Sequence, residues 1–236
     1  MPLDLFSTTR PDSELHPDFL KVRDSPLMAP ARAMLGSAAA AIHDPDGNLV
    51  EQFQTFGFDA RTFEIYLDAL FRSEGHSVDR SHARPDFLIS RAGITVAVEA
   101  VTSNPTPSRT YQPYSPLGLG KGLGSDEDLV DHLKNEPQIR MGSPLFSKLA
   151  KRYWELPHVS GLPFVLALQP FHEAGSLGLS STALASYLLG LHHRHRFENG
   201  RLIVEADPVA EHIGSKTIPS NFFGLPGAEH ISGVLF

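Results

Sequence analysis

The stretch Arg84-Pro-Asp-Phe-Leu-Ile-Ser-Arg-Ala-Gly-Ile-Thr-Val-Ala-Val-Glu-Ala-Val-Thr102 is typical of two short apolar β-strands joined by a tight turn. The turn falls at Ala92-Gly93, a length that suits a two-residue hairpin loop. Asp86 opens the first strand, and Glu99 lies near the end of the second. The stretch therefore predicts a β-hairpin with a carboxylate on each strand.

The register of this hairpin decides where the two carboxylates lie. A two-residue loop pairs Arg91 with Ile94, and counting back along both strands sets Asp86 directly opposite Glu99. Residues in such a pair have Cβ atoms about 5 Å apart, and like charges there are destabilising. A slip of one residue would set Asp86 opposite Val98 and send the carboxylates to opposite faces. With the two-residue loop, the hairpin is either strained or built to hold a cation.

The composition is that of a soluble globular protein, and the length suits one large domain or two small ones, of which one α/β core with insertions is the simpler expectation. The chain has 236 residues, of which 41% are hydrophobic and 20% are charged. It has no cysteine, which excludes disulfides, thiolate metal ligands and cysteine nucleophiles. We expect a cytoplasmic protein with no membrane partner, because no apolar run reaches the roughly 18 residues of a membrane span and the N-terminus is unlike a signal peptide.

The charge balance bears on nucleic-acid binding. A net charge of −7 argues against nonspecific coating of nucleic acid, which needs a basic surface, but a nuclease needs only a local basic patch. One candidate patch lies between residues 134 and 152, and a solvated helix face is the alternative reading. Its basic residues are Lys134, Arg140, Lys148, Lys151 and Arg152.

Periodicity and turn residues predict the order of the elements. The N-terminal segment 1–58 is expected to be an arm, extended over residues 1–28, with helices at 29–42 and 49–55 that pack on the core. The best helix follows, capped by Asp59 and ended by Gly75. Its apolar stripe contains Phe63, Tyr66, Leu67, Leu70 and Phe71.

Further elements are expected on both sides of the hairpin. A first strand at 76–80 precedes it, and a Pro- and Gly-rich loop over 103–125 follows. Downstream we expect helices at 126–133, at 143–155 with Ser143-Pro144 as cap and first residue, and at 182–191. Strands are expected at 162–169, 201–205 and 231–236, with a loop over 219–227. The pattern predicts a single domain overall, in which 1–58 packs on a core domain at 59–236 with a central mixed sheet flanked by helices and a C-terminal extension.

This order of motifs resembles the PD-(D/E)XK nuclease superfamily, which has a restriction-endonuclease-like core. The resemblance rests on Glu64 in the first helix, Pro85-Asp86 at a strand start, and Glu99-Ala100-Val101 at the end of the next strand, followed by a basic helix and a buried strand. It covers residues 59–170. It implies a metal-dependent endonuclease that hydrolyses phosphodiester bonds in nucleic acid, with DNA favoured over RNA.

The resemblance also implies a metal centre. Asp86 and Glu99 would be ligands of Mg²⁺, or of Mn²⁺, and Glu64 a third ligand, direct or through water. Glu64 lies at the edge of its helix's apolar stripe, where it could face the sheet; a boundary carboxylate on an amphipathic helix is the alternative.

One residue departs from the superfamily pattern. The lysine expected two positions after Glu99 is Val101 in this chain. In some members the lysine has moved to the helix packed behind the hairpin, which makes Lys148 the first candidate here and Lys151 its substitute; two solvated lysines are the alternative. A catalytically inactive module that binds nucleic acid or a protein partner is the other explanation of Val101.

Other candidates carry weaker signals. Gln169, at the end of a buried strand, and His172 after it could face the same site, although Gln169 could also satisfy a backbone group. The run 192–195 looks like a charged helix end and not a zinc site, and the Gly-Lys-Gly piece within 117–124 lacks the spacing of a phosphate-binding loop. A metal-free hydrolase using Asp86 and Glu99 as acid and base is a third hypothesis. A homodimer stays open.

Overall fold

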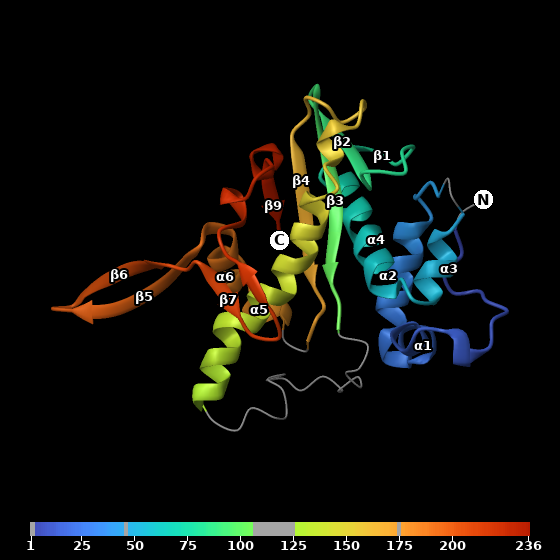
Figure 1. The fold of residues 1–236 in the computed structure, drawn as a ribbon. Helices are drawn as coiled ribbons and strands as arrows, with labels where there is room; N and C mark the ends of the chain where they lie inside the picture. Colours follow the sequence, from blue (N-terminus) through green and yellow to red (C-terminus); the bar gives the residue numbers. More distant parts are fainter. Residues whose placement is uncertain (1–2, 45–46, 106–125, 174–175) are drawn as a thin grey trace. The chain divides into compact units, whose positions relative to one another are not determined.

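The computed structural model describes residues 3–44, 47–105, 126–173 and 176–236 (Figure 1). The chain divides into two compact units. The first contains residues 1–100 and 161–165, and the second contains residues 101–160 and 166–236.

A five-stranded mixed sheet flanked by helices forms the centre of the fold, which confirms the predicted α/β class. The strand order is β1-β2-β3-β4-β9. The bounds are Ser77–Asp79 for β1, Phe87–Arg91 for β2, Ile94–Ser103 for β3, Phe164–Pro170 for β4 and Gly233–Leu235 for β9. Strands β1, β2 and β3 form an antiparallel meander.

The N-terminal residues fold into short helices around their own core, so the prediction of an extended arm over residues 1–28 is wrong. The helices are α1 (Pro17–Asp24), α2 (Ala29–Ala39) and α3 (Leu49–Gln54), with 3-10 turns at Asp12–Glu14 and Pro26–Met28. The Phe19 ring is fully buried and meets the Phe53 ring edge-on at 5.8 Å between centroids. The Pro- and Asp-rich composition gave no sign of this aromatic core. Burial of the aromatic rings offsets the conformational entropy that is lost when the segment becomes ordered.

Helix α4 (Phe58–Ser73) is the predicted amphipathic helix with two differences. Its N-cap is Gly57 and not Asp59, which lies in the first turn, where a carboxylate favours the helix dipole. Its buried face includes Glu64 and Asp68, whereas Tyr66 is 56% exposed. The buried stripe is therefore rotated away from Tyr66 and toward the acidic side chains.

The hairpin of β2 and β3 has the predicted register, with Arg91 paired to Ile94 and Phe87 paired to Val98. Both loop residues have positive φ, 52° at Ala92 and 80° at Gly93. Such a loop matches the right-handed twist of the two strands. A short loop thus sets the pairing along the whole hairpin.

A single helix, α5 (Asp126–Leu149), replaces the two helices predicted at 126–133 and 143–155. Ser143 and Pro144 lie inside it, and Ser143 Oγ donates to the Ile139 carbonyl at 2.7 Å instead of capping a new helix. After α5, Arg152 adopts a left-handed conformation that ends the helical path, and a 3-10 turn follows at Tyr153–Glu155.

Side-chain donors replace the backbone bonds that the two prolines of α5 cannot make. Pro137 and Pro144 have no N–H for the carbonyl groups four residues earlier, those of Leu133 and Arg140. Gln138 Nε2 donates to the Leu133 carbonyl at 3.3 Å, and Ser103 Oγ donates to the Arg140 carbonyl at 2.8 Å. These bonds explain how one helix continues through both prolines.

The C-terminal part contains α6 (Ser176–Leu189) and two hairpins. Strands β5 (Leu191–Glu198) and β6 (Arg201–Pro208) form one, and β7 (Glu211–Ile213) and β8 (Thr217–Pro219) form the other. The prediction of a helix end at 192–195 is wrong, because these residues pair with β6 across a turn at Asn199-Gly200. Within the predicted loop 219–227, the chain makes a 3-10 turn at Phe222–Gly224, and a second turn follows at Ala228–His230.

Candidate metal centre

The two hairpin carboxylates lie across from each other, one step beyond the last paired residues of β2 and β3. The Asp86 N–H donates to Glu99 Oε2 at 3.2 Å, and the Ala100 N–H donates to Asp86 Oδ2 at 2.8 Å. Glu99 is 3% exposed, and Asp86 is half-buried. These reciprocal backbone bonds orient both carboxylates, as the predicted register requires.

Glu64 reaches the same region from α4 and is held by two arginines. Arg61 Nη1 lies 2.8 Å from Glu64 Oε1 and 2.6 Å from Oε2, and Arg80 Nη2 lies 2.6 Å from Oε2. Burial raises the pKa of the Glu64 carboxyl, and the negative charge of Asp86 raises it further, while Arg61 and Arg80 act in the opposite direction. The Glu64 side chain is therefore close enough to Asp86 for the two charges to interact.

The arginines were not among the predicted site residues. Arg61 lies three positions before Glu64, a spacing at which helical side chains meet, so the sequence carries a local signal for this pair. Arg61 also donates to Gln52 Oε1 at 2.6 Å. Arg80 follows β1, and its guanidinium carbon lies 4.8 Å from the centre of the Phe87 ring. No local spacing connects Arg80 to Glu64, because the contact depends on the path of the chain after β1.

The described residues contain fewer clustered metal ligands than the three that the sequence predicted. Within residues 3–44, 47–105, 126–173 and 176–236, no group of three or more His, Asp or Glu side chains is placed to hold a metal ion. Asp86 and Glu99 are two facing carboxylates, and the contacts of Glu64 with Arg61 and Arg80 compete with a role as third ligand. A third-ligand role for Glu64 stays a prediction.

The candidate lysines belong to the second unit, whereas Glu64, Asp86 and Glu99 belong to the first. Lys148 is half-buried in the last turn of α5, and Lys151 is exposed just beyond it. Their predicted role at the site stays untested. Val101 is 2% exposed and follows Glu99 by two residues on β3, so both side chains point to the same face of the strand.

The remaining candidates lie in and just after β4 and in the segment after β3. Gln169 is half-buried in β4. The buried His172 lies with Nδ1 3.2 Å from Ser103 Oγ, in the second unit. The predicted loop 103–125 begins with the last residue of β3, and its glycine-rich part at 117–124 lies outside the described residues.

Comparisons with protein-family models, curated proteins and solved structures give no match to this chain. Among the helices in the described part of the chain, none has both the length and the apolar character of a membrane span.

Proposed function

We propose that Asp86 and Glu99 bind Mg²⁺, or Mn²⁺, in a phosphodiesterase that hydrolyses nucleic acid, as the resemblance to the PD-(D/E)XK superfamily implies. The observation that carries the proposal is the register of the β2–β3 hairpin, which brings the two carboxylates face to face. The order of elements supports it. A helix with a glutamate, three antiparallel strands, a second helix and a buried strand follow one another as α4, β1, β2, β3, α5 and β4.

The donor set suits a hard divalent cation. Mg²⁺ prefers oxygen ligands, keeps several waters, and is commonly held by one or two carboxylates together with substrate phosphate. The backbone N–H groups of Asp86 and Ala100 each donate to one carboxylate oxygen, which orients the pair. Two carboxylates this close favour a cation, because their mutual repulsion is relieved when it binds.

In this proposal each side chain has a distinct task. A cation held by Asp86 and Glu99 supplies positive charge for the phosphoryl transition state and lowers the pKa of an attacking water. Arg61 and Arg80 hold the Glu64 side chain in the region of Asp86, and their positive charges offset the negative charge of its carboxylate. Lys148, or Lys151 in its place, would supply the amine that the superfamily has at the position of Val101.

A second candidate function is a catalytically inactive module that binds nucleic acid or a protein partner. Val101 favours it, because an aliphatic side chain is buried in β3 where the catalytic lysine would stand. The engagement of Glu64 by two arginines favours it as well, since this carboxylate is already charge-paired.

Calorimetric titration of the full chain with Mg²⁺ and with Mn²⁺ tests the metal site. We expect binding that is lost in Asp86→Asn and in Glu99→Gln but is kept in Glu74→Gln, which removes an exposed carboxylate just after α4. Absence of binding to the wild type, or binding that survives Asp86→Asn, would contradict the proposal.

A cleavage assay on single- and double-stranded DNA and on RNA separates the two candidate functions. Metal-dependent hydrolysis that is lost in Asp86→Asn supports the nuclease, and comparison of Lys148→Ala with Lys151→Ala tests which amine takes part. Binding of nucleic acid without hydrolysis would support the inactive module.

A further inference from the structure

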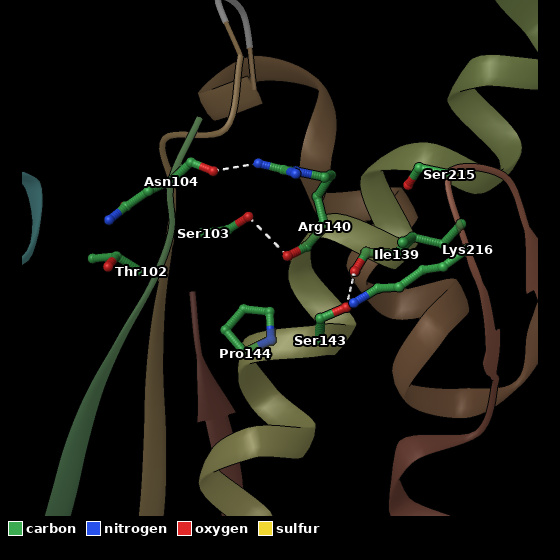
Figure 2. Close-up of a pocket in the computed structure, with 9 residues that line it drawn as sticks. All are labelled: Thr102, Ser103, Asn104, Ile139, Arg140, Ser143, Pro144, Ser215 and Lys216. Atoms are coloured by element: carbon green, nitrogen blue, oxygen red, sulfur yellow. Dashed lines mark hydrogen bonds between the residues drawn. The ribbon is translucent and has the colours of Figure 1, made fainter. Parts of the chain in front are cut away.

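A polar pocket of about 270 Å³ opens in the second unit, where the end of β3, the middle of α5 and the turn between β7 and β8 meet (Figure 2). Among the described residues that line it, two have cationic side chains, four carry hydroxyl groups, and none is acidic or aromatic. The lining residues are Thr102, Ser103, Asn104, Ile139, Arg140, Ser143, Pro144, Ser215 and Lys216.

Pro144, which lines this pocket, removes one backbone N–H donor from the continuous helix α5. Pro144 has no N–H that could donate to the Arg140 carbonyl. Ser103 Oγ, from β3, donates to this carbonyl instead, at 2.8 Å. The Arg140 side chain donates to the Asn104 carbonyl. The backbone and the side chain of Arg140 thus both connect α5 to the end of β3, and the guanidinium is held in place before any ligand arrives.

The serine hydroxyls of the pocket donate to protein acceptors. Ser103 Oγ donates to the Arg140 carbonyl, and Ser143 Oγ donates to the Ile139 carbonyl at 2.7 Å, as the dashed lines in Figure 2 mark. Ser215 Oγ donates to Glu136 Oε1 at 3.0 Å. Because a hydroxyl has one proton and two lone pairs, the oxygens of Ser143 and Ser215 can offer a ligand only acceptor sites. Ser103 Oγ is buried and lies 3.2 Å from His172 Nδ1.

The two cationic side chains of the pocket supply hydrogen-bond donors, whereas the serine oxygens supply acceptors. Lys216 extends from the β7–β8 turn toward Ser143 (Figure 2), and its ammonium group carries three donors. The guanidinium of Arg140 carries five N–H donors, one of which donates to the Asn104 carbonyl. The pocket therefore combines positively charged donors for an anion with hydroxyl oxygens that accept from neutral donors.

We propose that this pocket binds a small sugar phosphate, independently of the Asp86–Glu99 site. The phosphate accepts from Arg140 and Lys216, and sugar hydroxyls donate to the serine oxygens. A volume of about 270 Å³ lies just below the range of drug-sized ligand sites, so the ligand is small. A nucleotide fits less well, because none of the lining residues in the described part of the chain has an aromatic ring for base stacking.

The carboxylate of Glu136 sets the orientation of the ligand in the pocket. It accepts two hydrogen bonds from Ser215, from the backbone N–H at 3.2 Å and from the hydroxyl at 3.0 Å. A negative charge at that end repels a phosphate. The phosphate therefore belongs at the Arg140 end, and the sugar lies toward Ser215.

Calorimetry with the full chain tests the proposal, with ribose 5-phosphate, inorganic phosphate and ribose as the probes. We expect ribose 5-phosphate to bind more tightly than inorganic phosphate, and ribose alone not to bind. Lys216→Ala should weaken ribose 5-phosphate binding about tenfold, as expected for loss of a charge-assisted contact, whereas Lys134→Ala, on the same helix as Arg140 but outside the pocket, should leave it unchanged.

Additional variants keep the test decisive. Arg140→Lys retains the charge but not the fork of donors, so it should also weaken binding, and circular dichroism checks that it folds. Asp86→Asn should bind ribose 5-phosphate like the wild type, which separates this proposal from the metal site. No binding of ribose 5-phosphate, or binding unchanged in Lys216→Ala, would overturn the proposal. Equal affinity for inorganic phosphate would overturn the assignment of a sugar.

Discussion

Glu64 shows how the surroundings of one residue set its chemistry. A carboxylate on an amphipathic helix is ordinarily solvated, but this one is buried on α4 between Arg61 and Arg80 and beside Asp86. Burial and the charge of Asp86 raise the pKa of its carboxyl group. A raised pKa means that the folded protein binds this proton more tightly than the unfolded chain does.

The pH dependence of stability tests this environment. A raised pKa contributes stability that is fully present below the ordinary glutamate pKa and is lost as the pH rises through the folded-state value. The free energy of unfolding of the wild type, relative to that of Glu64→Gln, should therefore decrease as the pH rises from acid toward neutral. Urea denaturation of both proteins at a series of pH values measures this difference in the free energy of unfolding.

The control for that experiment is Glu74→Gln, which removes an exposed negative charge just after the same helix. The prediction would be contradicted if the free energy of unfolding of the wild type, relative to that of Glu64→Gln, increased with pH. It would mean that the contacts with Arg61 and Arg80 outweigh burial and lower the pKa of Glu64.

At the scale of elements, the two longer hairpins use different residues in the same kind of turn. The β5–β6 turn has Asn199 and Gly200 at φ of 51° and 75°, the pair that this geometry favours. The β2–β3 turn has Ala92 and Gly93 at 52° and 80°. The left-handed conformation costs an alanine about 1 kcal/mol or more, and asparagine tolerates it better.

Substitution of Ala92 by asparagine should therefore stabilise the protein. We expect Ala92→Asn to raise the free energy of unfolding by about 0.5–1 kcal/mol, because the new residue adopts the existing conformation at lower cost. Chemical denaturation measures the change. The reciprocal variant Asn199→Ala should lose a similar amount, and a decrease in stability of Ala92→Asn would contradict the turn geometry.

At the scale of the whole molecule, apolar side chains are unevenly buried. Phe222 is completely buried beside Tyr187, with ring centroids 6.0 Å apart. Phe197, on the β5–β6 hairpin, is 74% exposed. One face of that hairpin has apolar and histidine side chains, including Phe197, and the opposite face has the ion pair of Arg194 and Asp207. An isolated two-stranded hairpin contributes little to stability.

The two phenylalanines form a matched pair for mutation. Phe222→Ala should lower the free energy of unfolding by about 3–5 kcal/mol, because it leaves a cavity in a packed core. Phe197→Ala should cost less than about 1 kcal/mol, the range of an exposed cross-strand contact with Leu202. Thermal or urea denaturation of the two variants measures both. Equal losses would contradict the difference in burial.

Local patterns predicted the parts of the fold that depend on near neighbours. The two-residue loop fixed the β2–β3 register and hence the position of Asp86 relative to Glu99. Helices α2, α3 and α4 and strand β4 follow from composition and periodicity over a few turns. The errors arose where remote contacts compensate for local signals. Ser143 and Pro144 are a start signal for a helix, but the bond from Ser103 on β3 to the Arg140 carbonyl supports α5 where Pro144 lacks an N–H.

The sequence by itself determined the α/β class, the hairpin and its facing carboxylates, because strand alternation and turn length act over a dozen residues. Only the tertiary structure decided the surroundings of those carboxylates. Arg80 meets Glu64 across 16 positions of sequence, and Ser103 meets Arg140 across 37. Contacts between such distant positions depend on how the elements pack, and no local propensity encodes them. The charge state of Glu64 and the sugar-phosphate pocket proposed beside Arg140 both depend on such contacts.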